Sequence, residues 1–149
     1  MKTLFDQAAY QEISTRLEQL KPDTQRLWGK MNAAQMLAHC SNAIEFPLST
    51  DKLPRKFLGR ILGPFIKPTL VNDKPYKPSS PTAPNFVVEG ERDFSTEKIR
   101  LTSYLKDFHQ RGTAGMNPNP HPFFGTFTPK EWGITQYKHL DHHLKQFGL

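Results

Sequence analysis

Apolar residues recur at helical spacing in four separate segments of the chain. In residues 3–20 they are three and four positions apart: Phe5, Ala9, Ile13, Leu17 and Leu20. In residues 95–111 they follow the pattern i, i+3, i+4, i+7: Leu101, Tyr104, Leu105 and Phe108. Because this spacing places apolar side chains on one face of a helix, it predicts amphipathic helices. Residues 32–46 and 129–147 are predicted to form the other two long helices.

Capping motifs mark the starts of two of these helices. Asn32 is followed three residues later by Gln35, which is the capping-box pattern of a helix start, and Pro47 lies just beyond the expected end. Thr128 and Glu131 form the same pattern before the last helix, with a proline at its first helical position. The local sequence therefore predicts where both helices begin.

Prolines divide the chain between the helices. Eight of the thirteen prolines lie within residues 47–84, so this stretch is predicted to be a connection. Four amphipathic helices are most simply packed as an all-α four-helix bundle, which would form a single domain over residues 1–149. A long crossover, about residues 47–94, would then link the second helix to the third.

The crossover is too long for a structureless loop. We expect it to contain a short helix near residues 55–66 and an extended piece around Phe86, Val87 and Val88. Basic residues are interspersed among the apolar residues of this segment, and we expect the apolar ones to pack across the open end of the bundle. The alternative is a membrane-surface protein that lays residues 55–67 on anionic lipid.

Composition excludes several classes of protein. The chain has 149 residues, of which 36% are hydrophobic and 23% charged, as in globular rather than disordered proteins. Its single cysteine, Cys40, excludes an internal disulfide framework and a cysteine-only zinc site. The start of the chain does not read as a signal peptide, and no run of about 18 apolar residues occurs, so we expect a cytoplasmic protein. The formal charge of +6 is spread along the chain, which disfavours nucleic acid as a partner.

Histidines on two of the predicted helices face the inside of the bundle. Residues on a helix advance by about 100° each, so His139 and His143 lie about 40° apart at the edge of the apolar stripe. His142 falls on the exposed face of the same helix. His39 lies on the apolar side of the second helix. The spacing i, i+4 of the first pair also lets two imidazoles of one helix reach a single metal ion.

An inward-facing histidine also has an ordinary role. His39 alone would more often be a hydrogen-bonded core residue than a metal ligand. Three inward histidines brought together would repel one another if protonated, and a divalent cation resolves that conflict. Cys40, next to His39, points about 100° away from it and is expected to be a buried core residue.

Two segments carry a family resemblance: NAAQMLAHCSNAI, residues 32–44, and HPFFGTFTPKEWGITQYKHLDHHLKQFGL, residues 121–149. With the order of the helices, they resemble the DinB/YfiT-like superfamily, and more narrowly its DUF1569 branch. The resemblance implies a four-helix bundle that binds a divalent metal, often zinc or nickel, through three histidines. Carried onto this chain, these are His39 on the second helix and His139 and His143 on the last. Some relatives activate a low-molecular-weight thiol, others are hydrolase-like, and many have no established activity.

Three imidazole ligands leave a position open on a tetrahedral metal ion. A water or a thiolate bound there would become a better nucleophile, so we expect a metal-dependent hydrolase or thiol transferase with a small-molecule substrate. No catalytic side chain can be named. Five residues are candidates for the pocket or for holding the imidazoles: Gln35, His121, Glu131, Trp132 and Gln136. For His121, anchoring of its own loop is an equally good interpretation, and Trp132 has core packing as its alternative.

Other function classes stay open. A bundle whose metal is vestigial or absent would be a binding module or a stress-related interaction module. A homodimer is compatible with either class.

Overall fold

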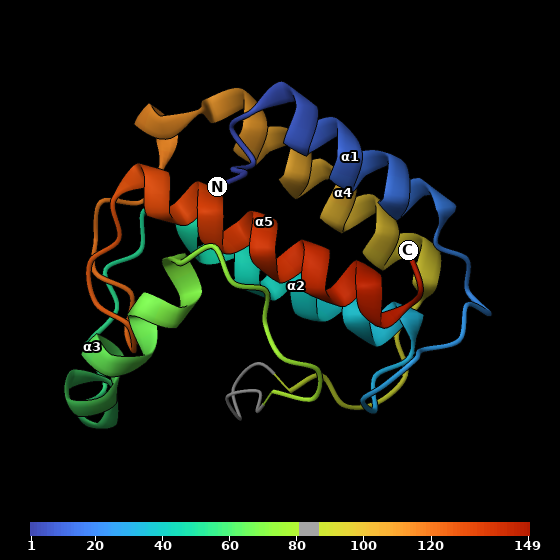
Figure 1. Ribbon diagram of the computed structural model, residues 1–149, viewed down its shortest axis with the longest axis horizontal. Helices are drawn as coiled ribbons and strands as arrows, with labels where there is room; N and C mark the ends of the chain where they lie inside the picture. Colours follow the sequence, from blue (N-terminus) through green and yellow to red (C-terminus); the bar gives the residue numbers. More distant parts are fainter. Residues whose placement is uncertain (81–86) are drawn as a thin grey trace.

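The protein is described by a computed structural model, in which residues 1–80 and 87–149 are placed. These residues form five α-helices, one turn of 3-10 helix and no β-strand (Figure 1). The elements are α1 (Gln7–Gln19), α2 (Ala33–Leu48), α3 (Phe57–Val71), α4 (Phe94–Arg111), η2 (Thr113–Gly115) and α5 (Pro129–Gln146). The all-α prediction is confirmed for this part of the chain.

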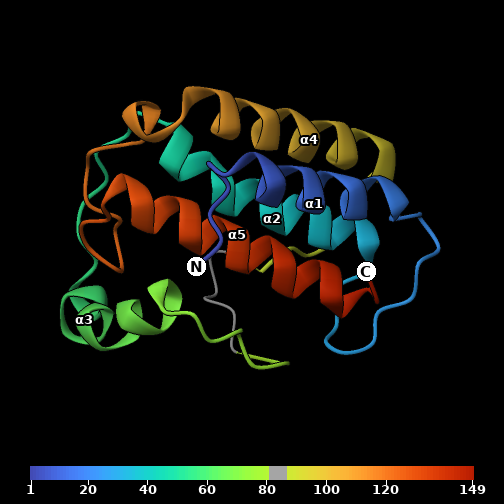
Figure 2. The same cartoon turned by 45° about the horizontal axis from the view of Figure 1, so that its top comes forward.

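Helices α1, α2, α4 and α5 pack together as a bundle. Helix α2 contacts both α4 and α5, and α1 contacts the same two helices. Helices α1 and α2 therefore lie diagonally opposite each other, as Figures 1 and 2 show. Fully buried side chains from these helices fill the interior: Ile13, Leu37, Ile44, Leu101, Leu105, Phe108 and Leu144. The predicted bundle packing fits this arrangement.

The predicted capping boxes are formed. Asn32 Oδ1 accepts from the Gln35 amide at 2.9 Å, and the Gln35 side chain accepts from the Asn32 amide at 3.0 Å. Thr128 and Glu131 make the same reciprocal pair, at 3.2 and 2.7 Å. These bonds satisfy amide groups that a helix start leaves without helical partners. The starts of α2 and α5 are thus determined locally.

Helix α2 runs past its predicted end at residue 46. Pro47 lies inside the last turn, and the helix ends at Leu48. A proline has no amide N–H, so the carbonyl of Ala43, four residues earlier, loses its usual helical donor. The Gln136 side chain of α5 donates to this carbonyl at 3.2 Å instead. Helix α5 therefore supplies the hydrogen-bond donor that the proline in α2 cannot provide.

Helix α3 lies in the crossover and docks through glycines. It has 15 residues, so it is longer than the short helix expected there. A Cβ added to Gly59 would lie 2.6 Å from the Cα of Phe123, and one added to Gly63 would clash with the carbonyl oxygen of Phe123. Only glycine allows the helix backbone to approach this loop so closely.

The expectation that the apolar residues of this segment pack across the bundle is wrong. Phe57 and Phe65 are each 79% exposed, because the glycine face of α3, and not the aromatic face, is the one that docks. Lys67 fastens the helix to α5 by donating to Glu131 Oε2 at 2.9 Å. Lys138 adds a second link, because it donates to the carbonyl of Thr69 at 2.9 Å.

The expected extended piece around Phe86, Val87 and Val88 is not confirmed. Phe86, one of the three residues expected to be extended, lies outside the described residues. Val87 and Val88 are not assigned to a strand. None of the described helices combines the length and the apolar character needed to cross a membrane.

Candidate metal centre

Three imidazoles from two helices meet between α2 and α5. Nε2 of His39 lies 2.9 Å from Nε2 of His139. The rings of His39 and His143 have centroids 4.7 Å apart, as do the rings of His139 and His143. One nitrogen from each of the three residues lies within 4.8 Å of the other two. The structure therefore brings together the three histidines that the sequence singled out.

The surroundings keep the imidazoles of His139 and His143 neutral. His39 and His143 are buried, and His139 is partly exposed. Burial, reinforced by the neighbouring histidines, holds the pKa of His139 well below its usual value. Burial first and His39 second lower the pKa of His143 to about 3. At neutral pH both rings are thus in the unprotonated form that binds metal ions.

Gln146 orients one imidazole of the cluster. Its side-chain Oε1 lies 2.9 Å from Nδ1 of His143, one helical turn earlier. A protonated Nδ1 donating to this oxygen leaves Nε2 as the ring nitrogen with a lone pair for a ligand bond. The sequence prediction missed Gln146. The signal that could have found it is the i, i+3 spacing from His143 on the apolar face of α5.

The loop between α1 and α2 holds Gln146 in turn. Gln146 Nε2 donates to the carbonyl of Trp28 at 2.8 Å. The next residue, Gly29, has φ +79°, and a Cβ at this position would clash with the Gln146 amide. Glycine is therefore required both for the backbone conformation and for the approach of the Gln146 side chain. The amide of Gln146 consequently has partners at both ends.

The donor set fits a divalent metal ion. Zinc–imidazole bonds of about 2.0–2.1 Å place two tetrahedral ligand nitrogens roughly 3.3–3.4 Å apart. This separation lies between the 2.9 Å of the closest pair and the 4.8 Å that bounds all three nitrogens. Neutral imidazole is a ligand that suits zinc and nickel among divalent ions. His39, His139 and His143 could therefore hold such an ion after changes of up to about 1.4 Å in the separations of their nitrogens.

Four buried polar atoms along α5 have no hydrogen-bond partner among the described residues. They are Trp132 Nε1, Thr135 Oγ1, Gln136 Oε1 and His139 Nδ1. Their spacing of three, four and seven residues places them on one face of α5, in a row that ends at the histidine cluster. The row contains donors and acceptors, as a site for a polar molecule requires.

The structure gives three of the predicted supporting residues other contacts. Gln35 closes the capping box of α2 and donates to the carbonyl of Gly90 at 3.0 Å. Glu131 closes the capping box of α5 and pairs with Lys67. Gln136 donates to the carbonyl of Ala43. These three polar side chains therefore make hydrogen bonds to backbone groups near a helix start or near Pro47 of α2.

His121 anchors its own loop. Its Nδ1 accepts from the amides of Phe123 and Phe124, at 3.1 and 3.2 Å. The ring stacks on Phe124 and contacts Trp132, with centroids 4.9 and 6.2 Å apart. Burial, with Arg55 second, lowers the pKa of His121 to about 4. Trp132 itself is buried and stacks on Phe127 at 4.2 Å, as a core residue does.

His142 is not on an exposed face, contrary to the prediction. It is half-buried between the rings of Trp28 and Tyr76, whose centroids lie 5.9 and 5.8 Å from its own. The helical angle was correct, but the loop after α1 and the crossover after α3 both fold over this side of α5. Cys40 is buried in the core as expected, and burial raises the pKa of its thiol.

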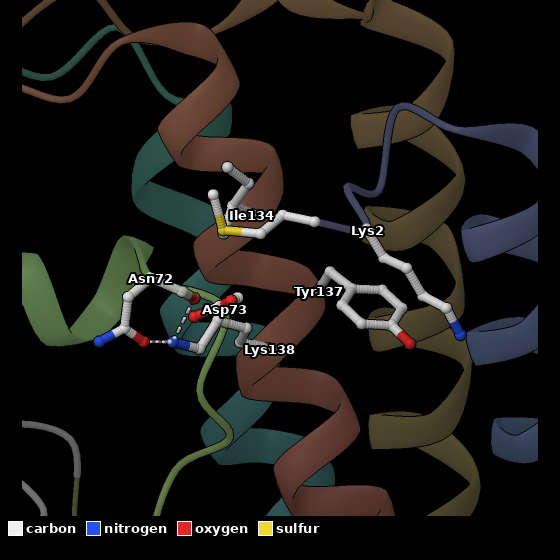
Figure 3. Close-up of a pocket in the computed structure, with 7 residues that line it drawn as sticks. Lys2, Asn72, Asp73, Ile134, Tyr137 and Lys138 are labelled. Carbon is white, nitrogen blue, oxygen red and sulfur yellow. Dashed lines mark hydrogen bonds between the residues drawn. The ribbon is translucent and has the colours of Figure 1, made fainter.

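A separate pocket of about 210 Å³ lies on the other side of α5 (Figure 3). Ile134, Tyr137 and Lys138 line it from α5, together with Lys2 and Asn72. Lys138 is held there by hydrogen bonds to Asn72, including one to its Oδ1 at 2.9 Å. On the helix these three α5 residues are roughly opposite to His139 and His143, so the pocket is not the mouth of the histidine cluster.

Comparison with known proteins identifies a family. Residues 3–148 match the family described as "Protein of unknown function (DUF1569)". No curated protein and no solved structure matches the chain. The family match spans nearly the whole sequence, including the α2 and α5 segments on which the resemblance rests. The chain belongs to the DUF1569 family, which is part of the DinB/YfiT-like superfamily.

Proposed function

We propose that the protein is a metal-dependent enzyme whose divalent ion, zinc or nickel, is held by His39, His139 and His143. The observation that carries this proposal is the convergence of three imidazoles from two helices, two of which, His139 and His143, have lowered pKa values. A structural role alone needs one partner per histidine, and it does not require three rings at one point. Three protein ligands leave a position for an exogenous ligand, which is the arrangement of catalytic sites.

The ion would lower the pKa of a bound water or low-molecular-weight thiol, so that a nucleophile is available at neutral pH. The protein's own residues would then position the substrate. The unpartnered atoms of Trp132, Thr135 and Gln136 are suited to bind polar groups of a small molecule beside the cluster. We therefore assign a hydrolase or thiol-transferase reaction on a small polar substrate.

Metal analysis tests this function directly. Protein purified without an affinity tag should contain close to one equivalent of a transition metal. Replacing His39, His139 or His143 by Ala should each remove it, because two imidazoles hold an ion far more weakly than three. The matched control is His142→Ala, which changes a neighbouring histidine that lies outside the cluster and should leave the metal in place.

Two results would contradict the assignment. If His142→Ala releases the metal while His143→Ala retains it, the wrong histidines have been assigned. If the tag-free protein neither contains nor takes up zinc or nickel while it is folded, the proposed metal-dependent reaction is ruled out.

A further inference from the structure

Helix α3 presents an apolar face to solvent. This face consists of five exposed side chains: Phe57, Leu58, Ile61, Leu62 and Phe65. At about 100° per residue, they span about 140° of the helix circumference, so they form one continuous strip. We call this strip the α3 apolar face. A contiguous apolar patch of this kind on a folded protein marks an interaction surface.

The way α3 docks directs this face outward. Gly59 and Gly63 lie about 40° apart on the opposite side of the helix, pressed against the backbone of Phe123. Rotating the helix to bury its aromatic residues would replace these glycines by bulky side chains in a contact too close for a Cβ. The exposure of the α3 apolar face is thus fixed by the sterics of the glycine face.

The segment that contains this face, between Asp51 and Asp73, carries charge of a single sign. The sequence from residue 52 to residue 72 contains five basic residues and no acidic residue. Lys56 and Arg60 are exposed within or beside the helix, whereas Lys67 is paired with Glu131. Arg60 lies about 60° beyond Phe57, near one border of the strip, and Lys56 is the residue before the first turn of the helix. Neither forms an ion pair among the described residues, and an apolar strip with such cations near its border and at the helix start complements a surface that is apolar inside and anionic at its boundary.

We propose that α3 is an interfacial helix that binds the surface of an anionic membrane. The five apolar side chains would enter the boundary between headgroups and acyl chains, and Lys56 and Arg60 would contact the anionic headgroups. A second copy of the chain is a poorer occupant, because a symmetric contact would bring the two cationic segments together. Helix α3 lies outside the four-helix bundle, at one end of it (Figures 1 and 2), so a flat surface can reach it.

Vesicle flotation with the full-length protein tests this proposal. Vesicles of phosphatidylcholine containing phosphatidylglycerol should bind the protein at least about tenfold more tightly than vesicles of phosphatidylcholine alone. Replacing both Phe57 and Phe65 by Ser should reduce binding by at least about tenfold. The matched control is Ile99→Ser, which removes a similarly exposed apolar side chain from α4. All three positions, Phe57, Phe65 and Ile99, are exposed, so the fold should be retained.

A second pair of variants tests the electrostatic part. Lys56→Gln combined with Arg60→Gln should weaken binding to the anionic vesicles several-fold, and Lys106→Gln on α4 should not. Wild-type protein that fails to float with anionic vesicles overturns the proposal. So does equal binding by the Phe57→Ser, Phe65→Ser variant, or a concentration-dependent dimer in sedimentation that this variant abolishes. Loss of bound metal leaves the flotation result unchanged, so the proposal stands or falls independently of the metal site.

Discussion

The side chain of Gln136 donates to the carbonyl of Ala43 at 3.2 Å, and this is the carbonyl that Pro47 leaves without a helical donor. The contact joins α5 to α2 between the histidine cluster and the aromatic residues around Trp132. A side chain of α5 thus provides the missing hydrogen bond to a backbone carbonyl of α2, and this bond lies beside the candidate metal centre.

A double-mutant cycle measures how much this hydrogen bond contributes to the free energy of unfolding. Gln136→Ala should destabilise the protein by about 1–2 kcal/mol, because a buried carbonyl loses its donor. In a Pro47→Ala background the amide of residue 47 can donate to the Ala43 carbonyl. Gln136→Ala should therefore lower the free energy of unfolding by less in that background. We expect a coupling free energy of about 1 kcal/mol from urea unfolding of the four proteins. The cavity left by Gln136→Ala is common to both backgrounds, so additive effects would rule out the hydrogen bond as the cause.

Gln146 should control metal affinity through His143. Gln146→Ala removes the acceptor at Nδ1 and should weaken metal binding by about 10–100-fold, as measured by competition with a chromophoric chelator. Gln146→Glu keeps an acceptor at this position and should retain more of the affinity than Gln146→Ala. The adjacent surface change Lys145→Ala serves as the control. Equal affinities for all three variants would show that Gln146 does not orient the ligand.

An open coordination position should accept an added ligand. Titrating the cobalt-substituted protein with a small thiol or azide should shift its visible bands saturably while the ion stays bound, because the added ligand completes the coordination. The shift should persist in Cys40→Ser, since Cys40 is buried in the core. Bands that respond to no added ligand would indicate a closed structural site and would remove the physical basis for thiol transfer.

Acid should destabilise the loop that His121 anchors. The pKa of His121 is about 4 in the folded protein, against an ordinary value of 6.5, so the unfolded chain takes up the proton first as the pH falls. Proton uptake by the unfolded state lowers stability, and the loss extends from about pH 6.5 down to about pH 4. For His121 alone it should reach about 2 kcal/mol between pH 7 and pH 4.5.

The variant His121→Asn isolates this effect. Its side-chain oxygen can accept the two loop amides but does not titrate. The difference in unfolding free energy between pH 7 and pH 4.5 should therefore be about 2 kcal/mol smaller than in the parent protein. An unchanged pH dependence would mean that other buried histidines account for the whole acid sensitivity.

Periodicity and capping were sufficient to predict the bundle helices. The start of α2 depends on Asn32 and Gln35, and the start of α5 on Thr128 and Glu131, all within four residues of the boundary they set. The angular argument also placed His39, His139 and His143 on inward faces, because burial along a regular helix follows its period. These features depend only on local geometry.

The failed predictions concern contacts between distant segments. The end of α2 depends on Gln136, which is 93 residues from Ala43 in the sequence. His142 is covered by the loop that contains Trp28, and no helical angle can show that. The outward turn of α3 follows from the fit of Gly59 against Phe123, a tertiary contact between residues that the sequence pattern treats as unrelated.

The chain from His143 through Gln146 to Trp28 has one further consequence. Two hydrogen bonds connect a candidate metal ligand to the backbone of a tryptophan, whose indole lies 5.9 Å from the ring of His142. The chain has only one other tryptophan, Trp132, in the aromatic cluster near the start of α5. The protein thus contains its own optical probe: in a Trp132→Phe background, the emission of Trp28 alone would report what happens at the histidines, with no label attached.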